Sequence, residues 1–550
     1  MIKQTIILLL LFFAHAGMSA TYYVSTTGND GNPGTLAQPW KTIQHGIDIA
    51  VAGDTVFIRG GVYLESLIFG NSGNATDGHI VFMNYPQETP VIDGTGMTGI
   101  SGLYMEEKSY IIIGGFEIRN WSGEIITILN NSDHIMLNNL DLHDFDFGVT
   151  FRGYGCHDIE VNNVEVHHYG GGNFDTYGFD ASYDTLTNNP HHDFVFNNCK
   201  AHSDMNPTQN IDGFATGHWC LTSIQYNFTF NHCVVYDVFD GFDMSAKNTL
   251  INGCLAYNVY NGAWKLWSDQ INLVNCIGYF APTADHPSCN GIAELDPGFP
   301  EGFYKKTVTI QNCTFYGGDH TIHVYKSGLD TLVLRNTIVS HSAMVSLYFE
   351  DPLILNPSYR GDYNIFNCLD TNRIITIAGV NDYTFSAWQV FSGKDSHSLQ
   401  ALDLLAVFMD TASYNLHMKP GSPAIDVGSP AGAPNVDYEG YPRPYGAGYD
   451  IGAYEMNPSS AVPGNANSQG RIKLLPNPAT FYTLIEFPET GSYRIYMMDG
   501  LGRTLQTKEV WNSDATHVDV SSYPPGTYFI CIKTIDGIST FSEKLIVAPR

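Results

Sequence analysis

The feature that most constrains the fold is a repeat of short alternating strands through the middle of the chain. Nine segments, among them "HIMLNNLDLHD", "DFVFNNCKAHS" and "TVTIQNCTFYG", each read as a strand, a polar turn and a second strand. The turn recurs every 21 to 24 residues, or after 34 to 37 where residues are inserted. It falls at Gly115, Asn139, Asn163, Asn198, His232, Gly253, Asn275, Asn312 and Asn336. This period, with no helical stripe, predicts an all-β fold, a parallel β-solenoid.

Two residue types in the repeat have a structural interpretation. Asparagine tolerates the left-handed turn conformation, and its amide can bond the same residue one rung away. The position after the turn holds Cys199, Cys233, Cys254, Cys276 and Cys313. Disulfides or a metal site are the alternatives, but the chain has no CxxC pair. We therefore expect an inward column of buried thiols.

A second column of glycines predicts a further strand entry in each rung. Its members are Gly148, Gly178, Gly213, Gly241, Gly262 and Gly291. Glycine eases the bend between two strand faces of a rung.

The segments outside the repeat suggest a domain plan. Residues 1–20 resemble an export signal, and residues 21–457 contain the solenoid. "KTIQHGIDIA" places Ile43, Ile47 and Ala50 on one face of a short helix that would cap the solenoid. The Gly/Pro-rich segment 421–455 is expected at the far end of the coil. Residues 458–470 read as a linker, and residues 471–550 as a small β-sandwich.

The formal net charge of −29 argues against nucleic acid and anionic membranes as partners. After the first 20 residues we find no apolar run long enough for a transmembrane helix. The sequence therefore suggests an exported protein, secreted or attached to the cell surface. We expect it to be a monomer.

Carboxylates gather beside the glycine column. Asp212 and Asp240 each precede one of its glycines, and Asp243 falls inside the following strand. Successive rungs of a parallel solenoid lie about 4.8 Å apart, so these groups would repel one another unless a cation held them. Oxygen ligands suit Ca²⁺, and Asp180 and Asn261 are further candidate ligands. Asp-Gly turn chemistry is the alternative explanation for the two residues before glycines.

One rung later, Lys265 lies between Trp264 and Trp267. A lysine close to a bound cation and partly desolvated by aromatic rings has a lowered pKa and can act as a general base. The alternative is a solvated lysine at the edge of a rung.

The stretch from Asp212 to Lys265, with "IDGF", "FDGFDMS" and "NGAWKLW", resembles polysaccharide lyase family nine, the pectate lyases built on a right-handed parallel β-helix. The resemblance implies that Asp212, Asp240 and Asp243 bind calcium and that Lys265 is the catalytic base. It also implies β-elimination on a uronic-acid polymer, either pectate (polygalacturonate) or rhamnogalacturonan. One departure matters, because Phe239 stands where the family has another calcium-binding aspartate.

The segment 471–550 resembles the C-terminal sorting domain of the type nine (Por) secretion system, through "PNPA", "DGLGR", "PPGTY" and "KLIV". The resemblance implies passage across the outer membrane by that machinery. The tail is then either removed or used as an anchor.

Two other functions compete with the lyase. A β-helix hydrolase of the polygalacturonase type uses several aspartates without a metal, and "NIDG" resembles one of its motifs. A non-catalytic β-helix adhesin or glycan-binding protein fits the sorting tail equally well. Within the lyase hypothesis, the inserted segments 170–190, 202–209 and 281–306 would shape the groove and select the polymer.

Overall fold

The computed structural model divides the chain into two compact units, Met1–Ala461 and Val462–Arg550. The predicted linker 458–470 and nearly all of the predicted signal 1–20 lie outside the described residues. The structure describes residues 19–97, 101–169, 176–181, 189–203, 210–216, 225–280, 289–295, 306–325, 329–350, 359–378, 380–456, 472–475, 477, 479, 482–498, 504–520, 523–524, 526–534 and 540–547. None of the helices in these ranges is long and apolar enough to cross a membrane.

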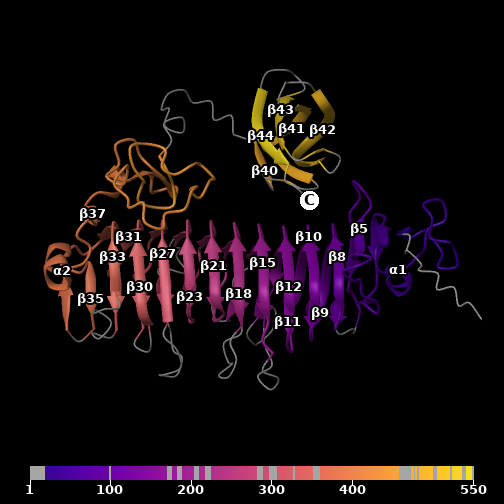
Figure 1. The fold of residues 1–550 in the computed structure, drawn as a ribbon, viewed down its shortest axis with the longest axis horizontal. Coiled ribbons are helices and arrows are strands. Elements are labelled where there is room, and N and C mark those ends of the chain that lie inside the picture. Colours follow the sequence, from indigo (N-terminus) through magenta and orange to yellow (C-terminus); the bar gives the residue numbers. More distant parts are fainter. Residues whose placement is uncertain are drawn as a thin grey trace, which may run out of the picture. The chain divides into compact units, whose positions relative to one another are not determined.

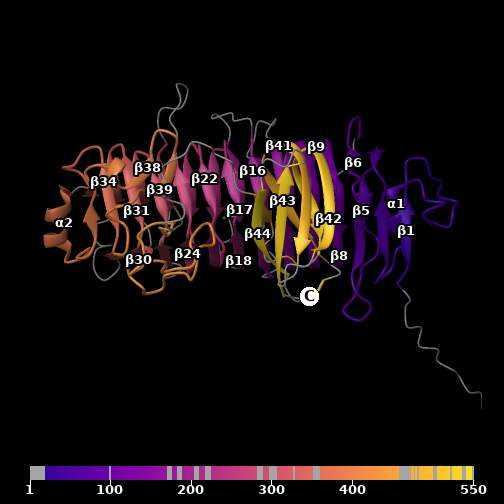
Figure 2. The ribbon, with the colours of Figure 1, turned by 90° about the horizontal axis from the view of Figure 1, so that it is seen from above.

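The first unit is a parallel β-helix, as predicted, in which each turn of the chain contributes strands to stacked sheets (Figures 1 and 2). The first sheet has 13 strands. They are β1 (Thr21–Val24), β2 (Thr55–Ile58), β5 (Ile80–Asn84), β8 (Ser109–Gly114), β10 (Asp133–Asn138), β12 (His157–Asn162), β15 (His192–Asn197), β18 (Tyr226–Asn231), β21 (Lys247–Asn252), β24 (Ile271–Val274), β27 (Lys306–Gln311), β30 (Leu329–Arg335) and β33 (Tyr359–Asp362). Neighbouring strands are parallel, and their register is continuous except for one shift between β27 and β30, so one rung repeats the residue types of the next.

The second sheet follows the polar turn of each rung. Its strands are β3 (Gly61–Tyr63), β6 (Pro90–Asp93), β9 (Glu117–Leu129), β11 (Asp141–Arg152), β13 (Glu165–Tyr169), β16 (Lys200–His202), β19 (Val234–Tyr236), β22 (Leu255–Tyr257), β25 (Ile277–Tyr279), β28 (Thr314–Tyr316), β31 (Ile338–Ser342), β34 (Ile365–Cys368) and β37 (Leu399–Gln400). The long strands β9 and β11 continue into the third sheet.

The third sheet carries the predicted glycine column and the candidate site. Besides β9 and β11, it contains β4 (Leu67–Ile68), β7 (Ser101–Glu106), β14 (Thr176–Ala181), β17 (Ile211–Thr216), β20 (Asp240–Met244), β23 (Gly262–Leu266), β26 (Gly291–Leu295), β29 (His320–Val324), β32 (Val345–Phe349) and β35 (Ile375–Ile377). The antiparallel strand β36 (Asn381–Tyr383) ends it.

The polar turn is left-handed at every predicted position, with φ between 50° at Asn336 and 79° at Gly115. The predicted amide ladder forms at two steps of the column, where Asn163 Nδ2 donates to Asn139 Oδ1 and Asn336 Nδ2 donates to Asn312 Oδ1, each at 3.2 Å. A longer ladder lies one residue earlier in the turn, with N–O distances of 2.8 to 3.4 Å. It joins Asn138, Asn162, Asn197, Asn231 and Asn252.

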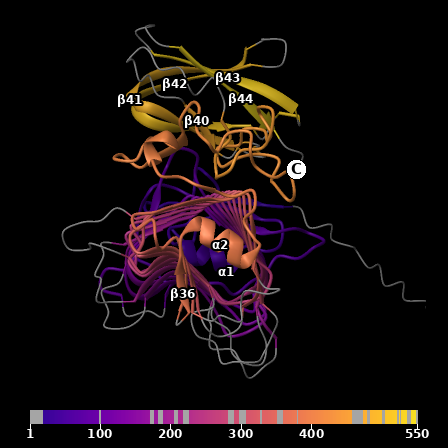
Figure 3. The same ribbon diagram turned by 90° about the vertical axis from the view of Figure 1, so that its left-hand side faces the viewer.

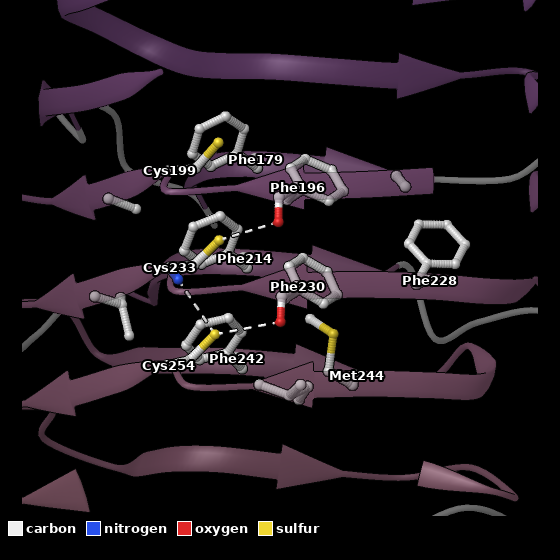
Figure 4. Close-up of a cluster of buried hydrophobic side chains, with 14 of the residues drawn as sticks. Phe179, Phe196, Cys199, Phe214, Phe228, Phe230, Cys233, Phe242, Met244 and Cys254 are labelled. Carbon is white, nitrogen blue, oxygen red and sulfur yellow. Dashed lines mark hydrogen bonds between the residues drawn. The ribbon is translucent and has the colours of Figure 1, made fainter. Parts of the chain in front are cut away.

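The predicted cysteine column is a column of buried free thiols. Figure 4 shows Cys199, Cys233 and Cys254 one above another, beside stacked phenylalanines. The thiol of Cys254 donates to the Phe230 carbonyl oxygen at 3.5 Å, which satisfies a weak donor inside an apolar core. The columns therefore stack identical small and large side chains rung upon rung.

Helices cover both ends of the coil. As predicted, α1 (Ile43–Ile49) buries Ile43 and Ile47, and the Thr42 hydroxyl caps it by accepting from the His45 backbone N at 3.3 Å. At the other end, α2 (Phe385–Ser392) lies over the last rungs (Figure 3) and buries Phe385 and Trp388. Each helix removes an exposed sheet end from solvent.

The expectation that 421–455 closes the far end is wrong. This segment runs back along the outside of the coil and hydrogen-bonds to turn asparagines. Asn336 Nδ2 donates to the Ser429 carbonyl oxygen at 2.8 Å, and Asn275 Nδ2 donates to that of Val436 at 2.8 Å. It packs together with the short hairpin β38 (Phe408–Asp410) and β39 (Asn415–Met418) over Ile277, Tyr316 and Ile338.

The second unit is the predicted small β-sandwich. Antiparallel strands β40 (Lys473–Leu475), β41 (Tyr482–Met498), β42 (Thr504–Asp519), β43 (Gly526–Thr534) and β44 (Thr540–Val547) enclose a separate apolar core.

Candidate active site

Three neighbouring strands of the third sheet bring the predicted site residues together. Asp212 comes from β17, Asp240 and Asp243 from β20, and Lys265 from β23. The register pairs Asp212 with Asp240, and Asp243 with Lys265. One oxygen of each of the three aspartates lies within 4.8 Å of the others, and all three side chains are buried.

One detail of the expected alignment is wrong. The strand register pairs Phe242 with Trp264, which are 22 residues apart in sequence. Gly241 and Gly262 are only 21 apart, so the glycine column slips by one residue between β20 and β23. Stacking in the core explains the slip, since the ring of Phe242 lies 4.8 Å from Phe214 and 4.7 Å from Trp264, centroid to centroid. Trp264 is consequently a core residue.

Lys265 forms the centre of the polar contacts. Its Nζ donates to Asp240 Oδ2 at 2.8 Å and to Asp243 Oδ2 at 3.2 Å. The indole N–H of Trp267 donates to the other oxygen of Asp243, and the ammonium lies 5.5 Å from the Trp267 ring centroid. Of the two expected tryptophans, only Trp267 covers the lysine.

The electrostatics of this arrangement differ from the expectation for the base. Burial lowers the pKa of Lys265, but the carboxylates of Asp240 and Asp243 outweigh it and hold that pKa above its usual range. Burial raises the pKa of Asp240, while the Lys265 ammonium opposes the shift. A lowered pKa at Lys265 thus requires a second positive charge on the aspartates.

The two further candidate ligands behave differently. Asp180 shares the column of Asp243, but Ala215 lies between them, so Asp180 stays outside the three-aspartate group. Asn261 touches the group through its amide nitrogen, which donates to Asp240 Oδ1 at 3.0 Å, while its amide oxygen accepts from Asn290 Nδ2 at 2.7 Å. Asn261 therefore orients Asp240.

The donor set fits an oxygen-preferring divalent cation. Three buried carboxylates at this spacing repel one another and need compensating charge. Phe239, where the resemblance leads one to expect another aspartate, offers only backbone, and its carbonyl oxygen accepts from the Asn261 backbone N at 2.9 Å. The group thus provides three carboxylates rather than four.

The sequence interpretation missed Glu294 of β26. The register places it directly after Lys265 in the same column, and its side chain is 1% exposed. Burial and then Asp240 raise its pKa to about 7. The sequence held one signal, because Glu294 lies three residues after Gly291, as Lys265 lies three after Gly262.

The family comparison matches two parts of the chain. Residues 22–279 match the family described as Pel9A-like, right handed beta helix region. The similarity extends over a little under half of the chain. This Pel9A-like region includes the three aspartates and Lys265, whereas Glu294 lies beyond it. Residues 473–548 match the secretion system C-terminal sorting domain, which confirms the second resemblance.

Individual relatives match over shorter stretches of the sequence. The chain is 39% identical over 105 residues to the uncharacterized protein YwoF of Bacillus subtilis, covering 18% of this chain and 22% of that protein. It is 35% identical over 86 residues to pectate lyase PEL9 of Emericella nidulans, covering 15% and 21%. The chain spans about a fifth of the length of these curated relatives.

Among solved structures, that of pectate lyase Pel9A is 14% identical with a TM-score of 0.47, over 80% of this chain and 97% of that one.

Proposed function

We propose that the Pel9A-like β-helix is a secreted polysaccharide lyase that cleaves a uronic-acid polymer, pectate or rhamnogalacturonan, by β-elimination. One observation carries the proposal. Lys265 is the only long basic side chain of the described strands β17, β20 and β23, and its ammonium contacts two of the three buried carboxylates. A base beside an oxygen-rich cation site suits proton abstraction next to a substrate carboxylate.

In this proposal the aspartates hold the cation, and Lys265 abstracts the proton. Asp212, Asp240 and Asp243 would hold calcium, which supplies positive charge that binds the uronate carboxylate and acidifies the hydrogen at C5. Lys265, freed of its proton, takes that hydrogen. The electron pair of the C5–H bond then forms the C4–C5 double bond as the C4–O bond breaks, and the departing oxygen keeps the electrons of that bond and takes a proton from water. Trp267 fixes Asp243 through its indole N–H, and Asn261 with the backbone N of Gly262 fixes Asp240.

The cation also explains how an acidic protein would bind a polyanion. The net charge of −29 repels a polyuronate at long range, whereas a divalent cation on the aspartates inverts the field locally. We further propose that the sorting domain directs the enzyme through type nine secretion, as a secreted or surface-attached protein.

Removal of divalent cations is expected to abolish cleavage. The full chain, treated with EDTA and dialysed, should form no product absorbing in the ultraviolet on polygalacturonate or rhamnogalacturonan. Added Ca²⁺ should restore the absorbance, because unsaturated ends form only by elimination. Treatment with EDTA that leaves the full rate would contradict the cation's role. Formation of reducing ends without ultraviolet absorbance would favour a hydrolase.

A further inference from the structure

Glu294 is a buried carboxyl that the proposed reaction does not yet use. Its Oε1 has no hydrogen-bond partner among the described residues. Buried polar groups in folded proteins nearly always have a partner, so a carboxyl in this state needs an explanation. The explanation concerns its neighbour in the column, Lys265.

The side chains of Lys265 and Glu294 meet over the same glycine. A Cβ added to Gly262 would lie 2.7 Å from Lys265 Cγ and 3.3 Å from Glu294 Cδ. The lysine stem and the glutamate carboxyl therefore share the space that the missing side chain leaves open. The stem of a lysine is flexible, so rotation about its last bonds redirects the ammonium without moving the backbone.

A divalent cation and the Lys265 ammonium would compete for the same aspartates. The Lys265 ammonium contacts an oxygen of Asp240 and an oxygen of Asp243, in the group that would hold a divalent cation. Two positive charges at one pair of carboxylates repel each other strongly in a buried site. A cation that binds there must displace the ammonium, and the displaced charge needs a new partner.

We propose that Glu294 is the second partner of Lys265, which accepts the lysine when a divalent cation occupies Asp212, Asp240 and Asp243. The inference rests on the cation site of the proposed function. Glu294 is a positioning residue in this account, because it holds the protonated lysine one rung away from the cation ligands until Lys265 gives up its proton and acts as the base. The pKa of Glu294, about 7, leaves the carboxyl ionised at about pH 8.5.

A double-mutant cycle on calcium affinity tests the inference. Isothermal titration calorimetry with CaCl₂ at about pH 8.5 compares the full-length protein with Glu294→Gln, Lys265→Met and the double variant. We expect Glu294→Gln to weaken calcium binding about tenfold when Lys265 is present, and less than about twofold when Met replaces it. Glu294→Asp, which keeps the charge, should retain most of the affinity.

The alternatives give different results. If Glu294 acts only through the long-range attraction of its negative charge for calcium, Glu294→Gln weakens calcium binding equally with and without Lys265. That result overturns the inference. An unchanged affinity in the Lys265 background also overturns it, with the cation site intact. If the unmodified protein binds no calcium, the cation site of the proposed function fails, and the inference fails with it. Because glutamine is isosteric with glutamate, the melting temperature of Glu294→Gln serves as the check on folding.

Discussion

Replacement of Lys265 by alanine is expected to reduce the elimination rate by about 10³-fold, since a positioned general base typically contributes 10²- to 10⁴-fold. The loss should appear in kcat on polygalacturonate or rhamnogalacturonan, measured as ultraviolet-absorbing product. The change also leaves Asp240 and Asp243 buried without their cationic partner, so lost stability could imitate lost catalysis.

Lys265→Arg separates these two effects. Arginine keeps a positive charge beside the aspartates but stays protonated at any working pH, so it cannot serve as the base. We expect a melting temperature near that of the unmodified protein together with the same loss of activity. Lys200→Ala is the matched control, because Lys200 pairs with Glu165 on the second sheet with 39% of its side chain exposed. Activity retained in both Lys265 variants would favour a non-catalytic role for this surface.

Replacement of Arg443 by alanine is expected to lower the free energy of unfolding by about 3–5 kcal/mol, because this is the usual cost of removing one partner of a buried ion pair. Arg443 Nη1 lies 2.8 Å from Glu455 Oε2, and the two side chains are 0% and 1% exposed. Its Nη2 also donates to the Gly452 carbonyl oxygen at 2.9 Å. The pair thus joins two parts of the segment that runs back along the coil, and its loss leaves the Glu455 carboxyl buried without its cationic partner.

Urea unfolding followed by tryptophan fluorescence measures this cost. Arg59→Ala is the matched control, because the Arg59–Glu88 pair is at least as close, at 2.6 Å, but its side chains are 36% and 28% exposed. Exposed pairs contribute about 1 kcal/mol or less, so the control should shift the midpoint little. Equal losses in the two variants would show that burial does not set the strength of the Arg443 pair.

The coil could be predicted because its signal is local and repeated. Each rung carries alternating strand residues and a left-handed turn, and the prediction holds from Gly115 to Asn336. The return of 421–455 along the coil had no such signal. It depends on the side-chain amides of turn residues such as Asn275 and Asn336, which donate hydrogen bonds to backbone carbonyl oxygens far along the chain.

The candidate site could be predicted in part for the same reason. Asp212, the pair Asp240 and Asp243, and Lys265 lie on three successive rungs, so the repeat alone brings them together. Glu294 was missed although the glycine column already placed Gly291 on its strand, because no motif marks a single glutamate three residues after that glycine. The one-residue slip at Gly262 depends on how aromatic rings stack in the core, which a glycine pattern does not encode.

The mass of the product tests the central claim most directly. The full-length protein with Ca²⁺ is incubated with polygalacturonate or rhamnogalacturonan, and the oligosaccharides are analysed by mass spectrometry. Elimination predicts products with an unsaturated end, each lighter by one water molecule than the corresponding hydrolysis product, and their absence with Lys265→Arg. Products that carry the added water, or unsaturated products formed at the full rate by Lys265→Arg, would contradict the account.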